Sequence, residues 1–152
     1  MKICIAGGTG SIGRALCLRL LRDRHQVTVL TRAPDKARQK VGAEVSLVDL
    51  ADDAAARRAI SSSEAVINLA GAGVAEKRWS QARQQVLRES RVDLTRRLVG
   101  YMADQPPKVF ISASAIGYYG DGAEQKLDEQ SGPGKGFLAE LCQEWEEAAV
   151  QA

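Results

Sequence analysis

The feature that most constrains the fold of this chain is a run of glycines between a short apolar strand and an amphipathic helix. The strand pattern covers residues 2–6, the glycine run GGTGSIG covers residues 7–13, and the helical pattern runs from residue 12 to residue 22. A strand that enters a helix through such a turn is typical of a βαβ unit, whose two strands are parallel. We therefore expect a parallel sheet with this turn at one end of a strand.

The rest of the chain alternates between short apolar runs and longer helical patterns. Further strands are predicted at residues 26–31, 44–48, 65–69 and 109–112, and further helices at residues 34–40 (helix or loop), 51–60, 81–103 and 137–149. This alternation predicts an α/β fold, a doubly wound parallel sheet with helices on both faces. We expect a Rossmann fold with strand order 3-2-1-4-5 and a ligand near the switch between the first and fourth strands.

Apolar repeats indicate which faces of two predicted helices pack inward. In the first helix, Ile12, Leu16 and Leu20 recur at intervals of four residues. In the long helix, an apolar stripe begins at Val86 and ends at Tyr101. Residues spaced in this way lie on one side of an α-helix, so we expect both stripes to face the sheet.

Composition excludes several classes of protein. The formal net charge is +2 and the basic residues are scattered among acids, which argues against nucleic acid as a partner. No apolar stretch is long enough for a membrane span, and the start lacks a signal-peptide pattern, so we expect a cytoplasmic protein. The only histidine, His25, lies in a turn, and Cys4, Cys17 and Cys142 are widely spaced, which argues against a metal site.

The glycine turn predicts a dinucleotide site. Gly7 permits the tight turn, Gly10 leaves room for a diphosphate beside the backbone, and Gly13 lets the helix pack closely on the strand. The helix N-terminus offers free N–H groups and a partial positive charge to phosphates. The predicted cofactor-binding residues of this turn are Gly7, Gly8, Thr9, Gly10, Ser11, Ile12 and Gly13.

The end of the second strand favours NADP(H) over NAD(H). An acidic residue there would accept hydrogen bonds from the ribose 2′-hydroxyl, but this strand ends at Thr31 and Arg32. Arg32 is suited to bind a 2′-phosphate, Thr31 offers a hydroxyl, and Lys36 or Arg38 would add positive charge. The alternative is that Arg32 is a solvated loop residue.

Two further segments complete the predicted cofactor site. Asp49 follows the third strand, with Leu50 beside it, and is placed to bond an adenine amino group. An ordinary strand-end aspartate is an equally good interpretation. Leu69, Ala70 and Gly71 end the fourth strand, where small residues let the backbone approach the cofactor.

The combination of these motifs with SASAIGYYG (residues 112–120) resembles the extended short-chain dehydrogenase/reductases, which include nucleotide-sugar epimerases and dehydratases. The chain is most similar to an atypical epimerase branch of unknown substrate, sometimes labelled a cell-division inhibitor, at KRW (77–79), SRV (90–92) and GFLA (136–139). Members of that branch are about twice this length. The resemblance therefore implies that residues 1–152 are the NAD(P)-binding domain and that the C-terminal substrate-binding part lies outside this chain.

The resemblance also implies a catalytic tyrosine, a lysine four residues later that lowers the tyrosine pKa, and a serine that positions the substrate. This chain departs from that pattern, because Phe137 and Leu141 stand at the tyrosine and lysine positions. The remaining candidates are Ser114 and Tyr119, although one alignment places Ala115 at the catalytic serine. A loop-packing role is an alternative for Tyr119.

Trp79, with Arg78 and Arg83, either covers the site, binds an anionic substrate, or simply packs at the start of a helix.

Two functions remain open for the chain as a whole. One is an NADP-dependent oxidoreductase or epimerase acting on a carbonyl or sugar-like substrate, and the other is a non-catalytic NADP-binding sensor or interaction module. The resemblance also implies a homodimer through the helices at residues 81–103 and 137–149.

Overall fold

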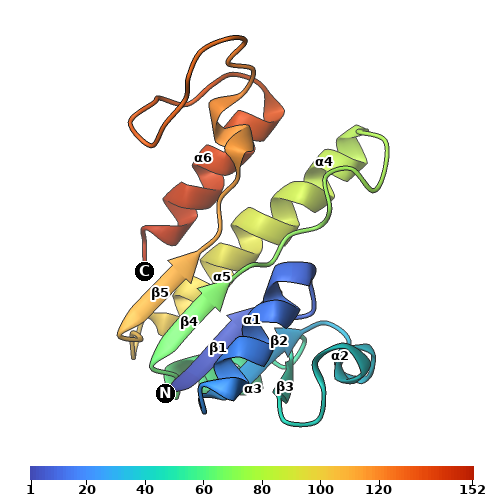
Figure 1. The fold of residues 1–152 in the computed structure, drawn as a ribbon, viewed down its shortest axis with the longest axis vertical. Helices are drawn as coiled ribbons and strands as arrows, with labels where there is room; N and C mark the ends of the chain where they lie inside the picture. The colour runs from blue at the N-terminus through green and yellow to red at the C-terminus, as the bar shows by residue number, and fades with distance from the viewer.

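The computed structural model describes all 152 residues and is built on one parallel five-stranded sheet. Its strand order is β3-β2-β1-β4-β5, and every neighbouring pair is parallel (Figure 1). This confirms the predicted Rossmann-like fold and strand order. The strands are β1 (Lys2–Ala6), β2 (Gln26–Thr31), β3 (Ser46–Asp49), β4 (Ala65–Asn68) and β5 (Val109–Ser112).

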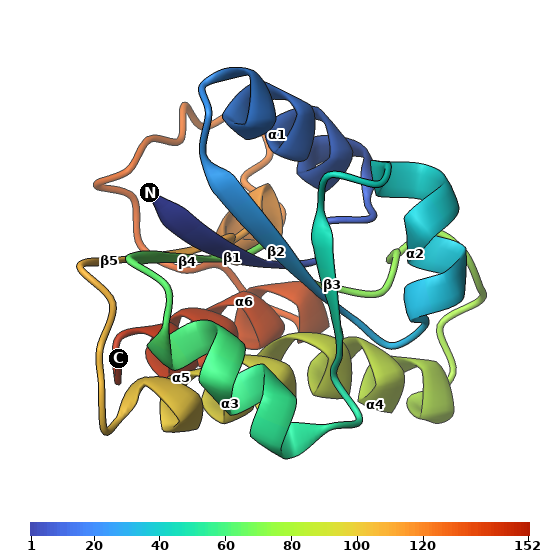
Figure 2. The same ribbon diagram turned by 90° about the horizontal axis from the view of Figure 1, so that it is seen from below.

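Helices cover both faces of the sheet. Figure 2 shows α1 and α2 on one face and α3, α4, α5 and α6 on the other. None of them is long and apolar enough to span a membrane. Their bounds are α1 (Ser11–Arg22), α2 (Pro34–Val41), α3 (Asp53–Ser61), α4 (Gln81–Arg88), α5 (Leu94–Met102) and α6 (Phe137–Ala149), with a π-helical turn η1 (Glu89–Asp93) and a 3₁₀ turn η2 (Ile116–Tyr119).

The core lies in two layers because the side chains of each strand alternate between the faces of the sheet. In β1, Ile3 and Ile5 pack toward α1 and α2, whereas Cys4 and Ala6 pack toward α3 and α5. Leu98 of α5 is fully buried in the second layer, a position that contributes about 1.5–3 kcal/mol for a side chain of this size. The two layers hold the carboxyl ends of the strands at one edge, where the predicted site lies.

The long helix predicted over residues 81–103 is formed by α4, η1 and α5 in succession. Val86, expected to face inward, is 41% exposed, while its neighbour Leu87 is fully buried. In a π turn the hydrogen bonds span one residue more than in an α-helix, so the inward face shifts by one position. The prediction for Val86 was therefore wrong, because a strict 3.6-residue period was applied across η1.

The inward face of α1 also differs from the prediction at its first turn. Ile12 is 74% exposed, whereas Gly13 and Cys17 are the buried residues of this helix. Gly13 faces the preceding turn so closely that a Cβ there would clash with the backbone of Gly7 and Gly8. A helix turns by about 100° per residue, so Ile12, next to the inward-facing Gly13, points away from the sheet.

Candidate functional site

The glycine turn joins β1 to α1 and is held by close backbone contacts. Gly7 has φ +81°, and a Cβ there would lie 2.6 Å from the carbonyl of Leu69. A Cβ on Gly13 would lie 2.4 Å from the carbonyl oxygen of Gly7. At Gly10, however, the nearest atom to a Cβ would be that same oxygen at 3.4 Å. Packing within the protein thus requires glycine at positions 7 and 13, whereas position 10 borders open space.

The first turn of α1 presents unpaired backbone donors at this open space. Gly10 is the N-cap residue and supplies no side-chain cap, and no acidic residue lies in the first turn. The amide of Arg14 donates to Gly10, but the amides of Ser11, Ile12 and Gly13 have no backbone acceptor. Free N–H groups at a helix N-terminus, with the helix dipole behind them, favour an anion such as a phosphate. The turn therefore has the donors that a diphosphate requires.

The end of β2 provides a cation without a partner. Arg32 is exposed and forms no ion pair or hydrogen bond. The hydroxyl of Thr31 accepts a hydrogen bond from the amide of Ala33 at 3.2 Å, and its carbonyl accepts one from the amide of Leu50 at 2.8 Å. The backbone at Thr31 is thereby fixed, while the guanidinium beside it remains available to a phosphate.

Arg38, which sequence reasoning offered as a second cation for this phosphate, is engaged elsewhere. Its Nη1 donates to the carbonyls of Gly42 at 2.6 Å and Val45 at 2.7 Å, so it holds the loop between α2 and β3. The prediction for Arg38 was wrong because these acceptors come from a loop that the sequence pattern left undefined. Lys36 is exposed on α2.

The turn after β3 carries Asp49 and Leu50. One carboxylate oxygen of Asp49 accepts a hydrogen bond from the amide of Ala51 at 2.9 Å, and the other oxygen has no partner. The side chain of Leu50 is buried in the core, so only its backbone faces the carboxyl edge of the sheet. The structure thus places this turn beside Thr31, to which it is hydrogen bonded.

The segment after β4 runs along the glycine turn. The amide of Leu69 donates to the carbonyl of Ala6, and that of Ala70 donates to the side chain of Asn68 at 3.2 Å. Asn68 is itself fully buried, and its Nδ2 donates to Thr95 at 2.8 Å. These bonds hold the backbone of Leu69 and Ala70, which lies against Gly7 and so runs beside the glycine turn.

Two arginines lie beside this wall, and sequence reasoning gave no role to one of them. The guanidinium of Arg91 lies against Gly71, where a Cβ would lie 2.9 Å from its Cζ, and over the ring of Trp145, with Cζ 5.3 Å from the ring centroid. Burial lowers the pKa of Arg91, and Arg83 lowers it further, although an arginine stays charged in proteins. Arg91 has no carboxylate partner. The sequence feature that could have predicted this position is the spacing of Arg91 from Arg83, about two helical turns along the predicted helix, which places both on one helix face.

Arg83 is also buried, but unlike Arg91 it pairs with a carboxylate. It donates to the carbonyl of Gly73 and pairs with the exposed carboxylate of Glu76 at 3.2 Å, while its Nε is buried without a partner. Arg83 therefore holds the loop that follows Gly71. Together the two arginines make this part of the site electropositive.

The candidate catalytic residues Ser114 and Tyr119 lie just before and at the end of η2, which packs against the first turn of α6 at Leu138. The hydroxyl of Ser114 donates to the carboxylate of Glu146, about two and a half helical turns along α6 from Phe137. Tyr119 packs edge-on against Tyr118 at 5.3 Å. Ser114 and Tyr119 line one cavity of about 360 Å³. The structure thus brings these two residues together but directs Ser114 toward Glu146.

Apolar side chains surround Phe137 and Leu141, at which the resemblance implies a tyrosine and a lysine. Phe137 contacts Trp79 edge-on, with ring centroids 5.8 Å apart, and Leu141 is buried in the core. The indole Nε1 of Trp79 donates to the carbonyl of Val74 at 2.8 Å, and the side chain remains 45% exposed. Trp79 therefore packs at the start of α4 and also covers Phe137. Neither Phe137 nor Leu141 can transfer a proton.

Comparisons with known proteins show the family to which this chain is similar. Residues 3–143 match the model of the NAD dependent epimerase/dehydratase family. The chloroplastic epimerase family protein SDR39U1 homolog of Arabidopsis thaliana is 38% identical over 157 residues, covering 100% of this chain and 45% of that protein. Epimerase family protein ML0860 of Mycobacterium leprae is 37% identical over 150 residues, covering 99% of this chain and 47% of that protein.

Among solved structures, human epimerase family protein SDR39U1 with NADPH superposes with a TM-score of 0.76 at 28% identity, covering 98% of this chain and 48% of that one. The chain thus spans about half the length of the relatives it matches.

Proposed function

This chain belongs to the NAD dependent epimerase/dehydratase family, and from that premise we propose that it binds NADP(H) as the cofactor domain of an oxidoreductase or epimerase. Its substrate would be a carbonyl or sugar-like compound. The observation that carries the proposal is the pairing of two features at one edge of the sheet. They are the unpaired amides of the first turn of α1 and the unpaired guanidinium of Arg32.

The residues present fit the cofactor. The amides of Ser11, Ile12 and Gly13 would hold the diphosphate, and the open space at Gly10 would admit it. Arg32 would pair with the 2′-phosphate, because a guanidinium binds phosphate in a bidentate manner. The cofactor would supply hydride chemistry, and the chain would supply binding and orientation. The NADPH bound by human SDR39U1 supports this choice of cofactor.

The test is a titration of the protein with NADPH and NADH, repeated for Arg32→Ala. We expect NADPH to bind more tightly, and we expect Arg32→Ala to remove most of the preference, about 1–3 kcal/mol for a lost charge-assisted contact. Arg22→Ala is the matched control, because Arg22 is an exposed, unpaired arginine at the far end of α1. Equal affinities of the parent protein for both cofactors would refute the assignment.

A second candidate function has a specific observation in its favour. Phe137 and Leu141 replace the proton-transfer pair, and Ser114 is bonded to Glu146. A non-catalytic NADP-binding sensor or interaction module would need the cofactor site but no acid or base. A screen of carbonyl compounds with the full-length protein distinguishes the two functions. Consumption of NADPH supports the enzyme, whereas tight NADPH binding without any consumption supports the sensor.

A further inference from the structure

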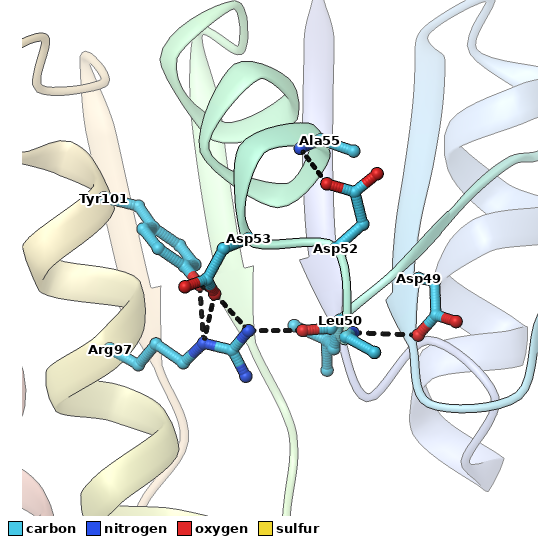
Figure 3. A network of polar contacts seen from close by, with 8 residues as sticks. Asp49, Leu50, Asp52, Asp53, Ala55, Arg97 and Tyr101 are labelled. Carbon is cyan, nitrogen blue, oxygen red and sulfur yellow. Dashed lines mark hydrogen bonds and ion pairs between the residues drawn. The ribbon is translucent and has the colours of Figure 1, made fainter.

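A polar network connects α5 to the turn that follows β3. The two segments are far apart in the sequence, and no sequence motif links them. Arg97 projects from α5 toward the start of α3 (Figure 3). Its Nε donates to the carboxylate of Asp53 at 3.1 Å, and its Nη2 donates both to that carboxylate and to the carbonyl of Leu50. The hydroxyl of Tyr101, one turn further along α5, donates to Asp53 as well. The three side chains thus converge on one turn of backbone.

The turn that they reach is the one beside the end of β2. The amide of Leu50 donates to the carbonyl of Thr31 at 2.8 Å, and its carbonyl accepts from Arg97. Leu50 is therefore held through its donor on one side and its acceptor on the other, while its side chain is buried in the core. This fixes the spacing between the turn that follows β3 and the segment that carries Arg32.

The magnitude of the ion pair shows that stability alone does not explain the network. The side chains of Arg97 and Asp53 are 39% and 75% exposed, and ion pairs this exposed add little to the free energy of unfolding, because water screens them. Arg97 nevertheless uses its planar fork to reach two acceptors from different elements at once, which fixes geometry more than it adds energy. The effect of such a contact is on the position of the backbone to which it donates.

We propose that Arg97 is a positioning residue for the adenine half of the cofactor site, because it holds the Leu50 carbonyl and so fixes the turn beside Thr31 and Arg32. Asp53 and Tyr101 orient its guanidinium. The inference rests on the proposed function, since it assigns Arg97 to the same NADP(H) site. Arg97 acts through the backbone and does not itself touch the cofactor.

The experiment measures the affinity for NADPH and for adenosine 2′,5′-bisphosphate, a probe of the adenine half alone, well below the unfolding temperature of each variant. Arg97→Met should weaken both affinities by the same factor, roughly tenfold, or about 1.4 kcal/mol. Arg97→Lys retains the charge that pairs with Asp53 but lacks the fork, so it should weaken both while changing the unfolding temperature little. Arg57→Met is the control, because Arg57 also lies over the Tyr101 ring, at 5.2 Å, without contacting Leu50.

The outcomes separate this inference from the proposed function. If the parent protein binds NADPH and both Arg97 variants bind the two probes as tightly as Arg57→Met, the positioning role is overturned and the proposed function stands. If the parent protein binds neither probe, the proposed function fails and the inference fails with it. Weakened binding by Arg97→Lys with an unchanged unfolding temperature supports the positioning role. A residue that only stabilises the fold would not show that combination.

Discussion

Alanine substitution at two glycines of the same turn should lower stability at one of them and cofactor affinity at the other. In Gly13→Ala the new Cβ would lie 2.4 Å from the carbonyl oxygen of Gly7 and 2.6 Å from the Cα of Gly8. Real Cβ atoms do not approach backbone atoms so closely, and neither neighbour is the end of a flexible side chain. In Gly10→Ala the only neighbour of the Cβ is an oxygen at 3.4 Å, and the backbone at φ −73° and ψ 174° suits alanine.

The magnitudes follow from these contacts. Overpacking costs about 1–3 kcal/mol, and because the contacts of Gly13→Ala are with backbone we expect the upper end, about 3 kcal/mol. For a chain of this size that lowers the unfolding temperature by about 6–12 °C. For Gly10→Ala, the reduced entropy of the unfolded chain offsets the weaker N-cap, so the free energy of unfolding should change by less than about 1 kcal/mol.

Cofactor affinity should separate the two variants further. The Cβ of Gly10→Ala would occupy the open space that we assign to the diphosphate, so NADPH binding should weaken strongly in a protein of nearly normal stability. Thermal unfolding by circular dichroism and titration by cofactor fluorescence measure the two quantities on the same samples. If Gly10→Ala binds NADPH as tightly as the parent protein, the diphosphate does not lie at this turn. If Gly13→Ala is as stable as the parent, the packing argument is wrong.

Two further predictions concern titrating groups. Hydrogen bonds from Tyr101 and Arg97 hold the pKa of Asp53 below its usual range, so the network stabilises the fold above about pH 4 and loses this effect as the pH falls through the lowered pKa. The stability difference between the parent and Asp53→Asn, measured by urea unfolding, should shrink from about pH 6 toward about pH 3, and a constant difference would contradict the role of the charge. All three cysteines are buried, and burial raises the pKa of Cys4 to about 12. A chromogenic thiol reagent should therefore label them only on unfolding, and rapid labelling of the native protein would contradict this burial.

Much of the fold could be predicted because the relevant signals are local. Alternation of apolar runs with helical patterns requires parallel strands joined by helices, and the spacing of Gly7, Gly10 and Gly13 indicates the turn between β1 and α1. The strand order followed from the arrangement that is usual in doubly wound parallel sheets that begin with such a glycine turn. The residue types at Phe137 and Leu141, where the resemblance implies a tyrosine and a lysine, were also visible in the sequence.

The sequence by itself thus determined the order of elements, the site of the glycine turn and the cation after β2. Only the tertiary structure decided which helix residues face inward after η1, that Arg38 holds a loop, and that Arg97 reaches the turn after β3. The physical reason is that a hydrophobic period or a glycine spacing is set by neighbours along the chain, whereas a guanidinium selects its acceptors among groups that folding brings together. The sequence shows which side chains are available, and the packing of the helices on the sheet determines what they contact.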